Sequence, residues 1–216
     1  MKRVSEMSTE HGPVRNAADE IFKTSMDYAI TIIGIVIISP LLIVLALIVK
    51  LDSPGPTINR RRVMGRGGTQ FDAFKFRTMV INGDEILAAR PNLKAKWERD
   101  QKLENDPRVT RCGNWMRKLS LDELPQLFNV LLGQMSLIGP RMFAPVEVTR
   151  YGNAVDDILS VKPGITGLWQ VSGRSNLSYE DRARLDLEYV RTRSVWMDLK
   201  LLLLTVPAVL QKRGAF

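Results

Sequence analysis

The adjacent acids Asp122 and Glu123, in the segment "KLSLDELPQL", have the residue types and spacing to do chemistry. An ionised aspartate is a competent nucleophile toward phosphorus, and a neighbouring glutamate is a natural ligand for Mg²⁺. Acidic residues also begin helices for structural reasons, and Ser120 with Glu123 fits a capping box. Taken by itself the pair favours the structural role, so its interpretation depends on the residues around it.

Pro125 indicates where this helix begins. If Ser120 were the cap, Pro125 would be the fifth helical residue and would remove a real hydrogen bond. If Asp122 is the cap, Pro125 is the third residue, where a missing N–H costs nothing. We therefore expect the helix to begin at Asp122, with both carboxylates against its positive end. That position favours the ionised carboxylate and attracts phosphate.

Basic residues in glycine-rich or turn-rich segments strengthen the chemical interpretation. They are Lys75, Arg77, Arg117, Lys118, Arg141 and Arg174. The chain has a net charge of +8 with 31 Lys and Arg, so the favoured partners are anionic: nucleic acid, acidic lipid or phosphorylated small molecules. Basic residues around acids, together with an apolar segment, suit a reaction between phosphorylated substrates at a bilayer surface.

Several other kinds of chemistry are excluded by composition. The single cysteine, Cys112, rules out an internal disulfide, and no Cys/His spacing fits a zinc site. The single histidine, His11, lies in a polar segment, which makes a Ser-His-Asp triad implausible. Catalysis must therefore rely on carboxylates, Lys, Arg or a bound metal.

An apolar segment precedes these residues. From Tyr28 to Val49 there are 22 residues without a formal charge, which as one helix would be about 33 Å long, enough to span a bilayer core. Both flanks are basic, as cytoplasmic flanks are. Pro40 predicts a kink near the middle, and Ser39 can donate its hydroxyl to a carbonyl that the kink frees. A kinked transmembrane helix and a re-entrant helix-break-helix both remain open on these residues, while a soluble core helix is disfavoured.

The rest of the chain predicts a mainly helical α+β fold. Alternation around residue 58 and in 70–79 predicts two short strands, joined by a hairpin loop at "MGRGG". A polar helix over 84–102 breaks or restarts at Pro91, and an amphipathic helix over 177–194 begins with Ser178 and Asp181. The apolar stretch 199–210 fits an interfacial helix or a core helix equally well.

At this point the sequence resembles a known family. The segments "KFRTM" (75–79), "DPRVTRCGNWMRKLSLDELPQLFNVLLGQMSLIGPR" (106–141), "VKPGITGLWQVSGR" (161–174) and "LDLEYV" (185–190) closely resemble the bacterial sugar transferases, which are monotopic phosphoglycosyl transferases. The match runs in order from about residue 22 to the C-terminus, and it is similar to the small type that has only the catalytic core. Residues 1–20 lie outside this match, and their polar composition predicts a flexible tail. The resemblance implies a re-entrant membrane helix (21–50) and a membrane-associated catalytic domain on the cytoplasmic face of the inner membrane (51–216).

The resemblance also implies a reaction and roles for individual residues. Such enzymes transfer a sugar 1-phosphate, here expected to be a hexose 1-phosphate, from a UDP-sugar to polyprenyl (undecaprenyl) phosphate, release UMP and require Mg²⁺; this is the first membrane step of exopolysaccharide assembly. Asp122 matches the nucleophile that carries a covalent phosphosugar, and Glu123 matches the acid associated with Mg²⁺. Asp186 matches a further active-site acid, and Arg117 a phosphate-binding arginine. The remaining matches are Lys75, Arg77, Arg141, Gln170 and Arg174 in the nucleotide-sugar site, and Ser39 and Pro40 at the break of the membrane helix.

Two other functions fit some of these features. A non-catalytic module anchored by one helix could bind acidic lipid or nucleic acid through its basic surface. The Lys and Arg residues are scattered among Gly- and Pro-rich loops without an aromatic stacking platform, which argues against nucleic acid. The same acidic pair could also hydrolyse a UDP-sugar with water as the acceptor. The family resemblance favours the transferase, for which a homodimer is a plausible state.

Overall fold

The computed structural model describes residues 17–100, 103, 105–173 and 177–210 of the chain. The predicted polar tail falls mostly outside this part, as does Arg174. Residues 17–20, which we had assigned to the tail, already belong to the first helix, so the tail boundary predicted at residue 20 is wrong.

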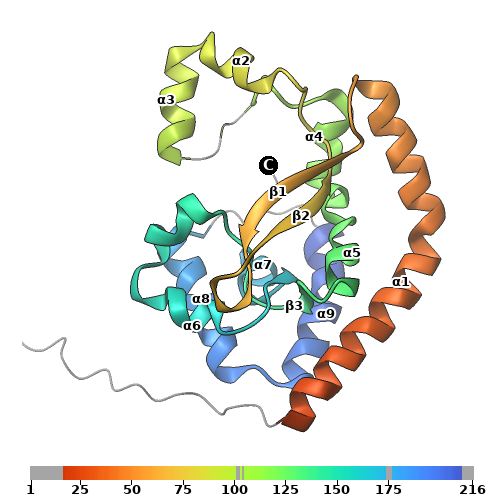
Figure 1. The fold of residues 1–216 in the computed structure, drawn as a ribbon, viewed down its shortest axis with the longest axis vertical. Helices are drawn as coiled ribbons and strands as arrows, with labels where there is room; N and C mark the ends of the chain where they lie inside the picture. Colours follow the sequence, from red (N-terminus) through yellow and green to blue (C-terminus); the bar gives the residue numbers. More distant parts are fainter. Residues whose placement is uncertain (1–16, 101–102, 104, 174–176, 211–216) are drawn as a thin grey trace, which may run out of the picture.

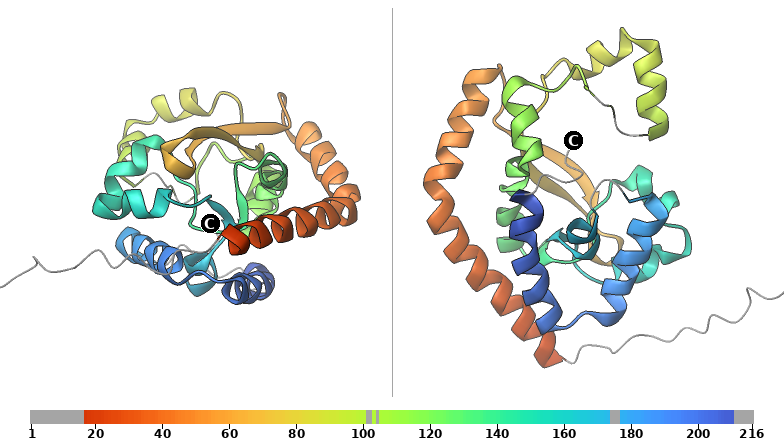
Figure 2. Two further views of the ribbon diagram at one scale, coloured as in Figure 1. Left: turned by 60° about the horizontal axis from the view of Figure 1, so that its bottom comes forward. Right: turned by 180° about the vertical axis from the view of Figure 1, so that it is seen from behind.

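The first helix, α1 (Ala17–Asp52), forms one flank of the molecule (Figure 1). We expected a break at Ser39 and Pro40, but the helix continues through Pro40 without interruption. It bends instead: Figure 2 shows its first and last parts running in different directions. The Ser39 hydroxyl donates a hydrogen bond of 2.9 Å to the carbonyl oxygen of Val36, the group that the Pro40 ring displaces, as the sequence predicts.

The two sides of α1 have different surroundings. Leu45 and Val49 are buried and pack with Phe76, Cys112 and Met116, which joins the end of the helix to the rest of the fold. The other side is apolar but exposed, and Ile37 for example is 71% exposed. This is the one helix, among the described residues, that is long and apolar enough to cross a membrane. An exposed apolar surface of this extent is typical of contact with lipid.

The predicted hairpin is confirmed. Strands β1 (Ile58–Met64) and β2 (Gln70–Phe76) pair antiparallel, with Ile58 opposite Phe76 and Met64 opposite Gln70. The turn between them holds Gly67 in a left-handed conformation (φ 66°), which glycine adopts without steric penalty. The hairpin crosses the middle of the molecule in Figure 1, and Lys75 lies near the end of β2.

A second, smaller sheet was not predicted. Strands β3 (Ser136–Ile138) and β4 (Gly164–Thr166) pair parallel. Three residues are too few to show a period of two, so the sequence pattern does not reveal them. The approach just beyond the sheet is close, because a Cβ atom on Gly139 would lie 2.6 Å from the carbonyl oxygen of Lys162. Glycine is therefore the residue that permits this packing.

The remaining helices surround these sheets. They are α2 (Gly83–Ala88), α3 (Pro91–Asp100), α4 (Arg111–Lys118), α5 (Gln126–Leu131), α6 (Val155–Leu159), α7 (Leu168–Ser172), α8 (Tyr179–Thr192) and α9 (Val195–Leu210), with short 3-10 segments η1 (Arg66–Gly68), η2 (Leu121–Glu123) and η3 (Pro145–Ala154). The restart at Pro91 is confirmed. So is the start of α8, where the Ser178 hydroxyl accepts a hydrogen bond of 3.1 Å from the backbone N–H of Asp181.

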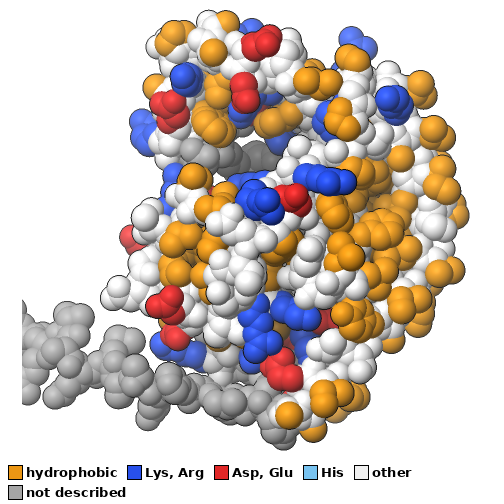
Figure 3. Space-filling model, viewed as in Figure 1, with side chains coloured by type: hydrophobic (Ala, Val, Ile, Leu, Met, Phe, Trp, Pro, Cys, Tyr) orange, Lys and Arg blue, Asp and Glu red, His pale blue; other side chains and the backbone are white. Residues whose placement is uncertain are grey.

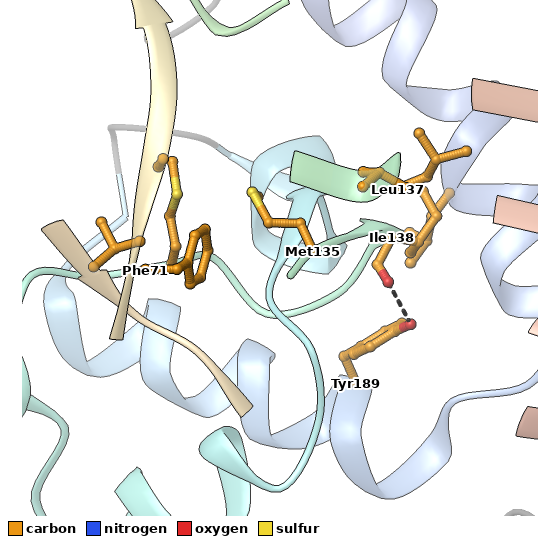
Figure 4. Packing of buried hydrophobic residues seen from close by; sticks show 10 residues of the cluster. Phe71, Met135, Leu137, Ile138 and Tyr189 are labelled. Carbon is orange, nitrogen blue, oxygen red and sulfur yellow. Dashed lines mark hydrogen bonds between the residues drawn. The ribbon is translucent and has the colours of Figure 1, made fainter. Parts of the chain in front are cut away.

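The main core lies between the hairpin, the small sheet and the last two helices. Figure 4 shows Phe71, Met135, Leu137, Ile138 and Tyr189 of this cluster. The buried Tyr189 hydroxyl donates to the carbonyl oxygen of Ile138 at 3.1 Å and to Asp198 at 2.7 Å. Helix α9 contributes both to the core and to the surface, since Leu201 is buried whereas Trp196 is 81% exposed. The core interpretation of this segment is confirmed for the side with Leu201, and the interfacial interpretation stays a prediction for the exposed side.

Candidate active site

The acidic pair lies in a short 3-10 turn and not in the first turn of an α-helix. Asp122 and Glu123 belong to η2, and α5 begins only at Gln126, directly after Pro125. The helix start that we predicted at Asp122 is therefore wrong. Pro125 immediately precedes the helix, at a position where the backbone N–H forms no intrahelical hydrogen bond, so its absence costs nothing. Ser120 makes no side-chain cap and holds a left-handed backbone (φ 55°), which turns the chain sharply into the pair.

Glu123 joins three separate parts of the chain. Its Oε1 accepts from the Lys75 ammonium at 2.6 Å and from the Arg141 guanidinium at 2.7 Å. Lys75 comes from β2, and Arg141 from the loop after β3. Burial by itself would raise the pKa of the Glu123 carboxyl, but Arg141 and Lys75 together hold this pKa well below its usual range. Glu123 is therefore a fixed negative charge at physiological pH.

Asp122 lies beside this ion pair in a different electrostatic environment. It is 8% exposed, and burial together with the neighbouring Glu123 raises the pKa of its carboxyl above the usual value. The charges of Lys75, Arg117 and Arg141 oppose this effect without cancelling it. Arg117 is held by a hydrogen bond of 3.0 Å from its Nε to the Thr78 hydroxyl. Any further cation near Asp122 would favour its ionised, nucleophilic form.

Asp186 contacts the group of charged residues formed by Lys75, Arg117, Asp122, Glu123 and Arg141. It lies on α8, is completely buried, and its Oδ1 accepts from the backbone N–H of Arg141 at 3.3 Å. Burial raises the pKa of Asp186 to about 8. The Arg141 guanidinium lies 5.8 Å from the centre of the Trp169 ring. Asp186 therefore contacts the cluster through the backbone of Arg141.

This buried acid predicts a pH effect on stability. The pKa of Asp186 is raised from 3.8 to about 8 on folding, so the folded state binds more protons between these values. The contribution of the protonated acid is complete below about pH 4 and is lost as the pH rises toward 8. Asp186→Asn keeps a neutral side chain at every pH. We expect it to unfold several degrees above the wild type at pH 8 and to match it near pH 4, as measured by thermal melts in detergent. A constant difference across this range would contradict the assignment.

Gln170 lies next to Trp169 on α7. Both polar atoms of its amide are buried and have no hydrogen-bond partner among the described residues. The same holds for Gln126, the first residue of α5, which the sequence analysis did not single out and which is completely buried. Its position four residues after Asp122 is the signal that could have drawn attention to it. Buried amides without partners are uncommon in folded proteins and often mark functional sites.

Arg77 is not part of this cluster. Its buried guanidinium donates to the carbonyl oxygens of Ser53 at 2.6 Å, Pro54 at 2.7 Å and Val49 at 3.1 Å. It therefore satisfies carbonyl groups at the end of α1 and in the turn that follows. Strand β2 ends at Phe76, so the alternation that would place Arg77 on the same side as Lys75 no longer applies. The sequence-based expectation that Arg77 lines the substrate site does not match this geometry.

Replacement of Arg77 tests this structural role. Arg77→Met removes three charge-assisted hydrogen bonds and leaves their carbonyl acceptors without partners, so we expect a loss of about 3 kcal/mol or more. This corresponds to a fall in unfolding temperature of roughly 6–12 °C for a chain of this size. Arg62→Met is the matched control, because Arg62 is exposed and forms only a surface ion pair of 3.3 Å with Asp72. Equal melting temperatures for the two variants would contradict the capping role.

The acidic pair fits a metal ion that the substrate helps to bind. No group of three or more His, Cys, Asp or Glu side chains within the described residues is arranged to hold a metal. Mg²⁺ is commonly held by one or two carboxylates together with substrate phosphates. Asp122 and Glu123 are adjacent, and Glu123 Oε2 has only a long contact of 3.4 Å with Arg141. These two carboxylates therefore suit a Mg²⁺ ion whose remaining ligands come from a phosphorylated substrate.

A buried aspartate and a partly buried glutamate lie among Lys75, Arg117 and Arg141, in a protein with a long apolar helix. This combination is typical of an enzyme that acts on phosphorylated groups close to a membrane. The comparisons agree with this class. Residues 18–212 match the model of the family described as "Bacterial sugar transferase", and the chain belongs to that family.

Relatives in several bacteria support the assignment. The chain is 46% identical over 203 residues to an "Uncharacterized sugar transferase" of Haemophilus influenzae (92% of this chain, 43% of the relative). It is 45% identical to the "Undecaprenyl-phosphate galactose phosphotransferase" of Salmonella typhimurium (92% and 42%). It is also 41% identical to the "Exopolysaccharide production protein ExoY" of Sinorhizobium fredii (91% and 88%). The chain thus spans less than half the length of the first two relatives and most of the third.

Proposed function

We propose that this protein transfers a sugar 1-phosphate from a UDP-sugar to polyprenyl phosphate and releases UMP. The observation that carries the proposal is the acidic pair of the buried Asp122 and the partly buried Glu123 among three cations, in a chain of the bacterial sugar transferase family. The Salmonella relative's name specifies undecaprenyl phosphate, and the Sinorhizobium relative's name specifies exopolysaccharide production. We infer the same acceptor and the same kind of pathway here, with a hexose as the sugar.

The residues of the cluster suit a reaction in two steps. An oxygen of Asp122 attacks the phosphorus that bears the sugar, and the diphosphate P–O bond breaks so that UMP leaves with the electron pair. An oxygen of polyprenyl phosphate then attacks the same phosphorus and displaces the Asp122 carboxylate. Dividing the transfer in this way avoids a direct meeting of two anionic substrates.

The neighbouring groups handle charge and position. Mg²⁺, when bound at Glu123, would neutralise charge on the diphosphate. Three cationic side chains of the protein also neutralise charge on the diphosphate and attract the anionic substrate: Lys75, Arg117 and Arg141. Asp186 holds the backbone of Arg141 at 3.3 Å and so positions its guanidinium. Gln170, with an amide that lacks a protein partner, is suited to contact the nucleotide sugar.

An assay of UMP release tests the function. The full chain in detergent micelles, with polyprenyl phosphate and Mg²⁺, is supplied in turn with UDP-glucose, UDP-galactose and UDP-N-acetylglucosamine. We expect continued UMP release only when acceptor and Mg²⁺ are both present, and fastest with a hexose donor; without acceptor, UMP release should stop at about one equivalent per enzyme, because the covalent intermediate then accumulates. Equal UMP release without the acceptor would instead indicate hydrolysis by water. No turnover with any donor would favour a non-catalytic module.

For the membrane, we propose that α1 enters and leaves on the cytoplasmic face of the inner membrane and that residues 51–216 form the catalytic domain on that face. The bend near Pro40 and the basic residues on both sides of the apolar segment support this topology. A re-entrant helix would hold Asp122 at the depth of the acceptor phosphate.

Accessibility labelling tests this topology. Single cysteines replace Ser5 and the exposed Leu51 in a Cys112→Ser background, and a membrane-impermeant thiol reagent is applied to spheroplasts and to inverted vesicles. Labelling of both positions from the cytoplasmic side supports the re-entrant helix. Labelling from opposite sides would show a helix that spans the membrane.

A further inference from the structure

A pocket lies at the N-terminal part of α1, away from the acidic pair. Its volume is about 370 Å³, and its lining comes from α1, β3, the hairpin turn and the segments around residues 162 and 193. Charged and phenolic groups line it: Lys23, Tyr28, Arg66, Lys162 and Arg193, with the acids Glu20 and Asp27. None of the proposed catalytic residues belongs to this lining. A ligand here would therefore occupy a different place from the reacting phosphates.

The buried polar groups of this pocket are already paired. Lys23 contacts Asp27 at 2.9 Å and Asp198 at 3.5 Å, and the Ser136 hydroxyl donates to Asp27 at 2.7 Å. At the edge, Arg193 pairs with Glu20 at 2.8 Å. These contacts use the acids of the lining and leave them unsuited to receive a cationic ligand. They also fix the orientation of the first turns of α1 against β3 and α9.

Two cations at the pocket are not paired in this way. Neither Arg66 nor Lys162 forms an ion pair with any residue in the described ranges. The Lys162 ammonium lies near the Tyr28 hydroxyl: a Cβ atom placed on Gly133 would be 3.9 Å from the former and 3.2 Å from the latter. The pocket thus offers an ammonium, a guanidinium and a phenolic hydroxyl as donors. Such a set is complementary to a phosphate group, whose oxygens only accept.

The surroundings favour a phosphate that belongs to a lipid. Ile21, which lines the pocket, and the next residue, Phe22, are exposed, and the charge-free part of α1 begins at Tyr28. Figure 3 shows basic side chains gathered beside the apolar flank formed by α1. A headgroup in the pocket would therefore leave its acyl chains next to an exposed apolar helix. Anionic lipids are attracted to basic clusters at such positions.

We propose that this pocket binds the phosphate of an anionic phospholipid that the enzyme does not consume. Arg66 and Lys162 contact the phosphate oxygens, the Tyr28 hydroxyl donates a further hydrogen bond, and the acyl chains lie along α1. The lipid would fix the start of α1 at headgroup level and so help to set the depth of the whole domain. This site is additional to the proposed transfer reaction and uses none of its residues.

Lipid binding to the full chain tests the proposal. Phosphatidylglycerol, phosphatidylcholine and soluble glycerol phosphate are each titrated into the protein in neutral detergent micelles, and bound molecules are counted by native mass spectrometry. We expect one phosphatidylglycerol to bind with saturation and more tightly than either alternative. Arg66→Gln with Lys162→Gln should weaken this binding about tenfold or more. The control is Lys94→Gln with Lys96→Gln, which removes the same charge from the exposed surface of α3.

Each result decides the matter. Loss of binding in the pocket variant but not in the control supports the site. Equal weakening in both variants would show attraction by net charge only, and equal binding of glycerol phosphate would show a site for soluble phosphate esters; either overturns the proposal. If the pocket variant melts more than a few degrees below the wild type, Lys162→Arg replaces it, because retained charge should then retain binding. The measurement needs no UDP-sugar, so its failure leaves the proposed transferase function unaffected.

Discussion

Asp122→Asn abolishes sugar phosphate transfer, lowering UMP release by at least about 10³-fold, because the amide cannot attack phosphorus. The same variant should fold and bind membranes normally. Burial raises the pKa of Asp122, so a neutral side chain of the same shape suits the resting site. We expect its unfolding temperature to equal or exceed that of the wild type. UMP release and thermal melts, measured on the same preparation, check both expectations.

The control for this variant is Asp84→Asn, which changes an exposed acid on α2. It should retain full activity. Without acceptor, the wild type should also gain the mass of one sugar phosphate on the peptide that contains Asp122, and Asp122→Asn should gain none. Release of UMP by Asp122→Asn at the wild-type rate would remove Asp122 from the role of nucleophile.

Glu123→Gln has the second large effect, and it affects both stability and activity. Removal of this charge leaves the partly buried Lys75 and Arg141 without their shared partner, which costs up to about 3–5 kcal/mol, the range for a fully buried pair. The melting temperature should therefore fall by up to about 6–20 °C, at 2–4 °C per kcal/mol. Activity should fall by about 10²-fold or more, since the two cations lose their positions and the proposed Mg²⁺ would lose a ligand.

A double variant separates the two effects. Lys75→Met in the Glu123→Gln background removes one of the unpaired charges, so it should restore part of the stability but none of the activity. The stability difference between wild type and Glu123→Gln should also depend on pH. The pKa of Glu123 is depressed in the folded state, so its contribution is present above the unfolded value near 4.5 and is lost as the pH falls below it. Strictly additive melting temperatures would show that Glu123 and Lys75 are not coupled.

Local features of this protein are readable in its sequence. The alternation around residue 58 and in 70–79, with a glycine-rich turn between them, predicts the hairpin, and Ser178 with Asp181 predicts the start of α8. Ser39 predicts its own hydrogen bond to Val36, because the two residues are three positions apart on a helix. In each case the interacting groups are close along the chain, so short-range spacing contains the necessary information.

The errors have equally local causes. The helix start at Asp122 was inferred from Pro125 alone, but a left-handed Ser120 and a 3-10 turn place the proline just before the helix. Arg77 was grouped with Lys75 because both belong to the motif "KFRTM", although β2 ends between them. The strands β3 and β4 are three residues each and meet only because distant glycines permit close approach. Helix α1 is continuous through Pro40, so the re-entrant break that the resemblance implies stays a prediction.

By itself, the sequence determined the family motifs, the apolar helix with its Ser-Pro bend, the hairpin and the identity of the acidic pair. Only the tertiary structure decided which basic residues accompany that pair. Glu123 meets Lys75, 48 positions away, and Arg141, 18 positions away, while Arg77 is withdrawn to the end of α1. Such long-range contacts depend on how the elements pack, and packing is set by burial across the whole fold rather than by spacing along the chain. The opposite pKa shifts of Asp122 and Glu123 follow from that packing alone.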